Sequence, residues 1–147
     1  MRYIRLGKGE FSEQVREFAE DERYQRLKDY TQHGNISTYT HCLRVARKSH
    51  NLARRLHIRV NEKEMLKGAM LHDYFLYDWH EKSDWHRLHG FSHAERALKN
   101  ASRDFDLTYR EKEIIRCHMF PLNITKGMPY PRALTVHHFW RIGHFAG

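Results

Sequence analysis

The chain has 147 residues, of which 40% are hydrophobic and 30% are charged. This composition is typical of one globular domain with its own core, and it excludes an intrinsically disordered chain. The apolar runs are only a few residues long, so we expect no membrane-spanning segment, no signal peptide and therefore a cytoplasmic protein. The two cysteines, Cys42 and Cys117, are too few for a disulfide scaffold and are expected to be reduced.

The formal net charge is +8, which favours anionic partners such as nucleotides, phosphate esters or nucleic acid. Several of the charged and polar residues recur at three- and four-residue spacing opposite an apolar stripe: Arg44, Arg47, Lys48, Asn51 and Arg55. No recognition-helix pattern and no aromatic residues interleaved with basic ones accompany them. We therefore interpret them as a solvated basic helix face rather than as a nucleic-acid surface.

Helical periodicity runs through almost the whole chain. Apolar stripes predict two short helices, around residues 11–19 and 24–30, and a stop for the second at the glycine of residues 33–35. Ser37 or Thr38 can cap the next helix, whose apolar stripe runs from Cys42 to Leu56.

Three later helices are expected to begin with a capping box, in which a polar side chain and a glutamate three residues on bond each other's backbone N–H groups. The pairs are Asn61 with Glu64, Ser92 with Glu95 and Thr108 with Glu111. Residues 78–91 are predicted to form a loop or broken helix, and residues 121–132 a loop. No long segment with a period of two competes, so we expect an all-α fold with a single domain over residues 1–147.

The chain is rich in histidine, with 13 residues of this type. His72 lies on the core-facing side of its predicted helix, and Asp73 points about 100° further round. His41 and His118 border the apolar faces of two other helices. A lone histidine on an apolar face is more often a hydrogen-bonded core residue than a ligand. A shared divalent metal ion better explains why three helices each direct an imidazole inward, and Asp73 would supply negative charge to that ion.

The run Gly68-Ala-Met-Leu-His72-Asp73, with His41 on an earlier helix, resembles the core of the HD domain superfamily. The step His89-Gly90 and the run that ends in His118 resemble further elements of its two-metal members. The resemblance is closest to small stand-alone bacterial members and covers about residues 20–132. It implies an HD-type helical bundle that is incomplete or altered at its C-terminus.

The resemblance also implies the ligands of two metal ions, namely His41, His72 and Asp73 for the first, and Asp73, His89 and His118 for the second. Asp73, which would bridge the ions, is the residue to which it assigns a catalytic part. The implied activity is that of a metal-dependent phosphohydrolase, in which a metal-activated water attacks the phosphorus of a small phosphorylated substrate such as a nucleotide. One or two ions of Mn, Fe, Co, Ni or Zn suit such ligands. Some two-metal members instead hold a di-iron pair and oxidise their substrates, so an oxygenase stays an alternative.

The C-terminal segment departs from the family's pattern, which ends with an aspartate on a late helix. No aspartate follows Asp106, so residues 133–147 form an atypical tail. A histidine could replace the missing ligand, or only the second metal could be kept. A reading-frame change or truncation, which we favour, would leave a catalytically impaired metal-binding remnant. The histidines that could replace the aspartate are His137, His138 and His144.

Other histidines have weaker interpretations. His93, one helical turn after His89, could be a ligand, although the resemblance points to His89. His80 and His86 could line the mouth of a substrate site or belong to a polar surface loop. The remaining group, expected to be exposed or terminal, comprises His33, His50 and His57.

Overall fold

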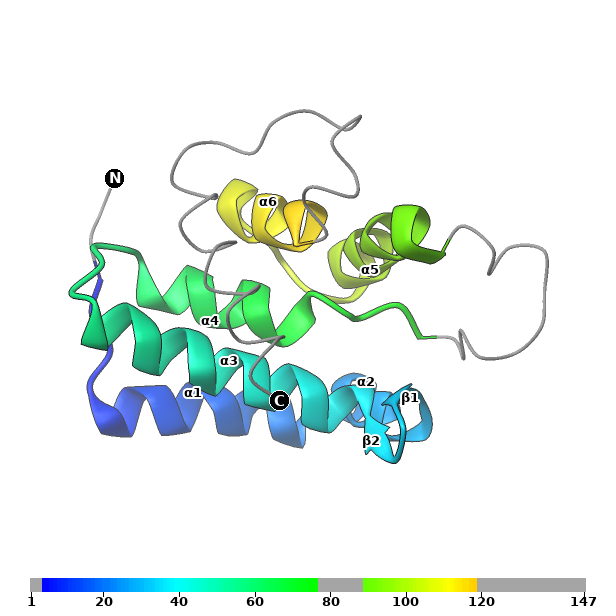
Figure 1. Cartoon of the computed structure of the whole chain (residues 1–147), viewed down its shortest axis with the longest axis horizontal. Helices are drawn as coiled ribbons and strands as arrows, with labels where there is room; N and C mark the ends of the chain where they lie inside the picture. Colours follow the sequence, from blue (N-terminus) through cyan, green and yellow to red (C-terminus); the bar gives the residue numbers. More distant parts are fainter. Residues whose placement is uncertain (1–3, 77–88, 119–147) are drawn as a thin grey trace.

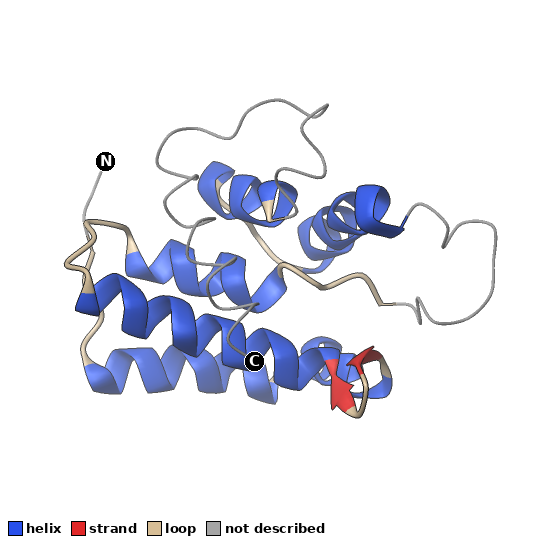
Figure 2. Cartoon of the chain, in the orientation of Figure 1, coloured by secondary structure: helices blue, strands red, loops and turns tan. Residues whose placement is uncertain are grey.

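The computed structural model describes residues 4–76 and 89–118 of the chain. Most of these residues lie in six α-helices (Figure 1), which confirms the predicted all-α fold class. One short β-hairpin accompanies the helices in this part of the chain (Figure 2). Within these ranges no helix has both the length and the apolar character needed to cross a membrane.

The N-terminal part of the chain forms five short elements before the first long helix. They are α1 (Lys8–Glu20), α2 (Glu22–Gln25), the 3₁₀ turn η1 (Arg26–Asp29), β1 (Thr31–His33) and β2 (Ile36–Ser37). The first predicted helix is confirmed as α1. The second is found as α2 followed directly by η1, and these helical turns end at Asp29 because Tyr30 already has an extended backbone conformation. The predicted stop at residues 33–35 is instead the turn of the hairpin, where Gly34 has a φ of +55°. The hairpin was not expected from the sequence, since strands of three and two residues are too short to show alternation.

Helix starts agree with the predicted caps in three of four places. Ser37 caps α3 (Thr38–Arg55), Asn61 caps α4 (Glu62–Leu71), and Thr108 forms a capping box with Glu111 at α6 (Tyr109–Cys117). At α4 only the Asn61 half of the predicted capping box is present, because Oε1 of Glu64 accepts a hydrogen bond from the Thr108 hydroxyl instead. The prediction for Ser92 is wrong, because α5 (His89–Asp104) already begins at His89. Residues three apart share a face inside a helix as well as at its start, so the Ser92–Glu95 spacing alone does not mark a boundary.

Helix α4 lies between α3 on one side and the α5–α6 pair on the other (Figure 1). Its residues Met65, Leu66, Ala69, Met70 and Leu71 are all at most 3% exposed. Gly68 permits the close approach of α6, since a Cβ atom there would lie 2.7 Å from Cγ2 of Ile114. The chain therefore leaves α4 at His72 and Asp73 inside the protein.

The start of α4 is also buried, and it is held by the N-terminal segment. The carboxylate of Glu62 accepts a hydrogen bond from the backbone N–H of Leu6 (2.8 Å). His50 of α3 stacks on Phe11 with 4.2 Å between ring centroids, and its Nδ1 lies 3.6 Å from Oε2 of Glu62. The expectation that His50 is exposed is therefore wrong: it is 6% exposed, because α1 covers that side of α3 through Phe11. His57 is exposed as expected.

Candidate metal centre

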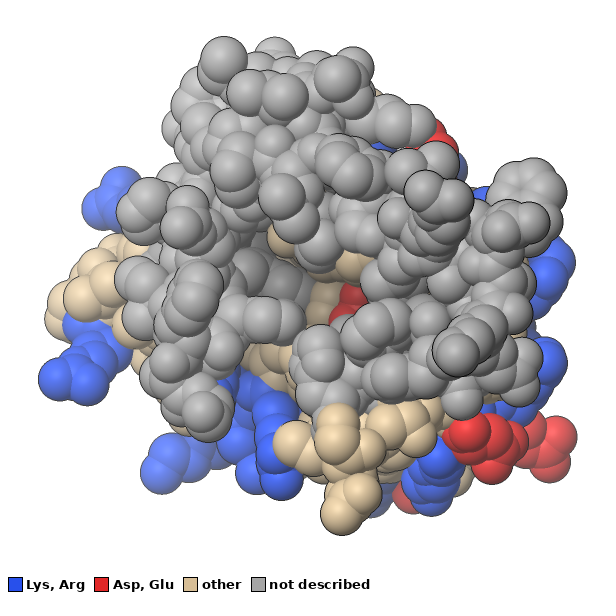
Figure 3. Space-filling model, turned by 45° about the vertical axis from the view of Figure 1, so that its right-hand side comes forward, with Lys and Arg blue, Asp and Glu red and all other residues tan. Residues whose placement is uncertain are grey.

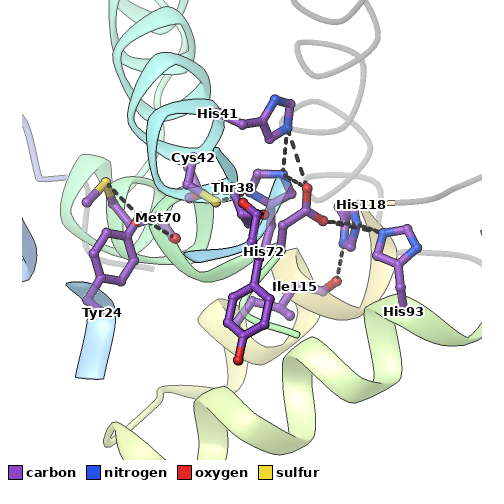
Figure 4. A network of polar contacts seen from close by, with 12 residues as sticks. Tyr24, Thr38, His41, Cys42, Met70, His72, His93, Ile115 and His118 are labelled. Carbon is purple, nitrogen blue, oxygen red and sulfur yellow. Dashed lines mark hydrogen bonds and ion pairs between the residues drawn. The ribbon is translucent and has the colours of Figure 1, made fainter. Parts of the chain in front are cut away.

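Five polar side chains from four helices meet beside the end of α4. They are His41 from α3, His72 and Asp73 from the end of α4, His93 from α5 and His118 from the end of α6. Figure 4 shows the rings of His41 and His72 on one side of this cluster and those of His93 and His118 on the other. Helix packing thus brings together residues that are up to 77 positions apart in the chain, since the cluster extends from His41 to His118.

The carboxylate of Asp73 lies at the middle of the cluster. Its Oδ2 is 3.5 Å from Nε2 of His41 and 3.0 Å from Nε2 of His72. Its Oδ1 is 3.3 Å from Nε2 of His93 and 3.2 Å from Nε2 of His118. Each carboxylate oxygen therefore faces two imidazoles, and each pair of imidazoles comes from two different helices.

The donor atoms form two groups that could each hold a metal ion. One consists of His41, His72 and Asp73, and the other of Asp73, His93 and His118. Within each group the candidate ligand atoms lie within 4.8 Å of one another. Asp73 belongs to both groups, which is the arrangement of a carboxylate that bridges two ions.

His72 and His118 are oriented by the same local device. Each occupies the C-cap position of its helix, and its Nδ1 lies close to the carbonyl oxygen three residues earlier. The distances are 2.8 Å from His72 to Ala69 and 2.6 Å from His118 to Ile115. These carbonyls belong to the last helical turn, where no backbone N–H is available to them. A carbonyl oxygen only accepts, so Nδ1 carries the hydrogen in both rings, as in histidines that bind metals through Nε2.

This tautomer points the Nε2 lone pairs of His72 and His118 toward the carboxylate of Asp73. Burial lowers the pKa of His118 to about 4, so its ring is neutral near pH 7. Burial alone would raise the pKa of the Asp73 carboxyl, and the facing imidazoles of His72, His118 and His93 hold this pKa well below its usual range only while they carry a proton on Nε2. A neutral imidazole lone pair that faces an ionised carboxylate at about 3 Å is unfavourable unless a cation lies between them.

The backbone adds to this preference for a cation. Helices α4 and α6 both end at the cluster, and a helix C-terminus carries partial negative charge. Nitrogen donors together with one carboxylate suit a divalent transition metal ion. The residues present therefore fit the metal ions that the sequence predicts, on the chemistry of the donors and on their orientation.

The structure brings together four of the five predicted ligands: His41, His72, Asp73 and His118. The fifth, His89, is the first residue of α5, and its side chain lies outside the described part of the protein. His93, to which the resemblance did not point, also lies in the cluster, with 2.7 Å between its Nε2 and that of His118. His89 and His93 are four residues apart and therefore lie on one face of α5. This spacing can be seen in the sequence, but it does not determine which of the two histidines is a metal ligand.

Several predictions concern residues outside the described ranges. They include the substrate-side roles of His80 and His86 and the replacement of the distal aspartate by a histidine of the tail. The single domain over residues 1–147 and its atypical tail at 133–147 likewise stay predictions. The histidines of that tail are His137, His138 and His144.

Comparisons with known proteins identify one family. The family model of the HD domain matches residues 38–139, which is more than half of the chain. The match includes all five side chains of the cluster and ends within the 133–147 segment. No curated protein and no solved structure matches the chain.

Proposed function

Because the chain belongs to the HD domain family, we propose that it is a metal-dependent phosphohydrolase that cleaves a small phosphate ester, such as a nucleotide. The observation that supports this most directly is the pair of donor groups that share Asp73. A two-ion site of this kind is suited to phosphoryl transfer, in which negative charge develops on both the attacking and the leaving oxygen.

In this proposal His41, His72 and Asp73 hold one divalent ion, and Asp73, His93 and His118 hold a second. When bound, the ions supply positive charge for the phosphoryl oxygens and lower the pKa of water. The protein contributes orientation: the Ala69 and Ile115 carbonyls fix the rings of His72 and His118 before substrate arrives. It also contributes a site that excludes bulk water, since His72, Asp73 and His93 are all nearly buried.

The proposal is tested by metal analysis and a substrate panel on the purified protein. The panel consists of phosphomonoesters, phosphodiesters and nucleotides, each assayed with Mn, Fe, Co, Ni and Zn. The matched variants are Asp73→Asn and Asp29→Asn, because Asp29 is an exposed aspartate of η1 that belongs to neither group of candidate ligands. We expect Asp73→Asn to lose bound metal and phosphate release together, while Asp29→Asn keeps both.

Three other outcomes would contradict the proposal. Stoichiometric metal in a folded Asp73→Asn variant would refute the ligand assignment. Oxygen consumption by the iron-loaded protein, without phosphate release, would identify the oxygenase alternative. Metal binding without turnover of any substrate would identify a catalytically impaired remnant.

A further inference from the structure

The candidate metal centre is least buried on the side of α3. The side chain of His41 is 14% exposed, whereas those of His72, Asp73, His93 and His118 are between 1% and 6% exposed. Of these five side chains, His41 is therefore the one that a molecule from solvent reaches most easily. Groups on α3 next to His41 are well placed to contact whatever extends out of the centre.

The residues that follow His41 on the same side of α3 are cationic. Lys48, seven residues later, lies within about 20° of His41 around the helix axis, and Arg44, three residues later, lies about 60° away, so both share the exposed side of α3 that borders His41. Both are exposed. A helix rises 1.5 Å per residue, so their Cα atoms lie about 5 and 10 Å from that of His41 along the axis.

The side chains of α3 give this helix a net positive charge. The helix carries five Lys or Arg residues and no acidic residue: Arg44, Arg47, Lys48, Arg54 and Arg55. On other helices the arginines have carboxylate partners close by in the chain, such as Asp21 for Arg23 and Glu113 for Arg116. Among the described residues no carboxylate forms an ion pair with Arg44. Figure 3 shows that Lys and Arg side chains gather at the left and lower left of one face of the protein, where no Asp or Glu is visible.

Building on the proposed function, we propose that Arg44 and Lys48 form a second phosphate-binding position beside the metal centre. The substrate then carries at least one phosphate group beyond the one that is cleaved, as in a nucleoside polyphosphate. The cleaved phosphate lies at the Asp73 cluster, and the further phosphate extends past His41 to the guanidinium of Arg44. An arginine binds phosphate oxygens through two parallel N–H groups, and a lysine adds a point charge.

A binding measurement tests this without requiring turnover. The probes are inorganic tripolyphosphate and orthophosphate, titrated into the metal-loaded protein by calorimetry. We expect wild-type protein to bind tripolyphosphate at least about tenfold more tightly than orthophosphate, and Arg44→Ala to remove most of that difference. Arg44→Lys should keep part of it, because the charge remains while the paired N–H groups are lost.

Arg55→Ala is the matched control, since Arg55 is an exposed arginine of the same helix, about 20 Å along the axis from His41. It should keep the wild-type ratio of the two affinities. Equal affinities for the two probes in wild-type protein, or an unchanged ratio in Arg44→Ala, would overturn the inference.

The two proposals can fail separately. If the protein hydrolyses monoesters but binds tripolyphosphate no more tightly than orthophosphate, the proposed phosphohydrolase activity stands and the second phosphate position is refuted. An Arg44-dependent preference in a protein that releases no phosphate from any substrate would refute the hydrolase and support the binding position.

Discussion

The Nε2 atoms of His93 and His118 lie 2.7 Å apart, although the two residues belong to different helices and are 25 positions apart in the chain. His118 is held by the Ile115 carbonyl, so its Nε2 presents a lone pair to His93. Both rings also face Oδ1 of Asp73. This geometry places His93 in the second group of candidate metal ligands, whereas the side chain of His89 lies outside the described part of the protein.

The first prediction separates these two histidines. We expect His93→Ala to lower the affinity for the second metal ion by more than about 100-fold, because loss of a partner behind a ligand already costs 10–100-fold. His89→Ala should have the smaller effect, and His57→Ala, at an exposed position, should have none. Metal content after dialysis against a weak chelator measures all three variants. A greater loss in His89→Ala would restore the assignment made from the sequence.

The second prediction concerns the contact between α4 and α6. We expect Gly68→Ala to destabilise the protein by about 1–3 kcal/mol, since the new Cβ meets Ile114 and overpacking costs this much. The ~0.5–1 kcal/mol that alanine gains over glycine inside a helix offsets only part of that loss. Urea unfolding of the metal-free protein measures the change.

Two further variants control this experiment. Gly9→Ala should not destabilise the protein, because nothing lies within 4 Å of a Cβ atom at Gly9. Ile114→Ala should partly rescue Gly68→Ala by removing the methyl groups that collide with the added carbon. Strictly additive effects of Gly68→Ala and Ile114→Ala would show that the two residues do not compete for the same space.

The third prediction concerns the hydroxyl of Tyr24, which donates a hydrogen bond to the Met70 carbonyl at 2.9 Å. Tyr24 is fully buried, and Met70 lies in the last turn of α4, just before His72. We expect Tyr24→Phe to destabilise the protein by about 1–3 kcal/mol, because the buried carbonyl loses its hydroxyl donor. Tyr109→Phe, at a residue that is 69% exposed, should change stability by less than about 0.5 kcal/mol. Equal unfolding midpoints for the two variants would contradict this.

The fourth prediction is a pH dependence that arises from His50. Burial lowers its pKa, the carboxylate of Glu62 partly opposes this, and Arg54 adds to it. The unfolded chain therefore binds a proton at His50 at a higher pH than the folded protein does. Its contribution to stability is complete above the unfolded pKa of about 6.5, and it is lost as the pH falls toward the lower pKa of the folded state.

The variant His50→Gln lacks this titration. The free energy of unfolding of metal-free wild-type protein, relative to the variant, should decrease as the pH falls from 7 to 5. Urea titrations of both proteins at several pH values provide the measurement. A difference that stays constant over this range would show that burial does not perturb His50.

Much of the fold follows from local signals in the sequence. The caps at Ser37, Asn61 and Thr108 each satisfy backbone N–H groups within a few residues, so their chemistry is visible without tertiary structure. The burial of His50 could not be predicted in the same way. It depends on α1 packing through Phe11 against a face of α3 that shows no apolar stripe of its own.

Most of the candidate metal ligands, like most of the helix starts, could be predicted from the sequence. His41, His72, Asp73 and His118 border apolar helix faces, and a residue at such a border comes close to neighbouring helices once the faces pack. Which of His89 and His93 lies nearer to the candidate metal centre depends on the position of α5 along its own axis relative to α6. A helical repeat does not determine that distance, since both histidines occupy the same face.

Because α4 is buried, few of its residues can be substituted without destabilising the fold. From Met65 to Asp73 almost every position is enclosed, and even the addition of one methyl group at Gly68 has no room. Mutations that alter substrate preference must therefore accumulate elsewhere if the folded state is to survive them. Among the described residues, the exposed side of α3 next to His41 borders the centre and has room for substitution, so laboratory evolution of this protein should enrich changes there.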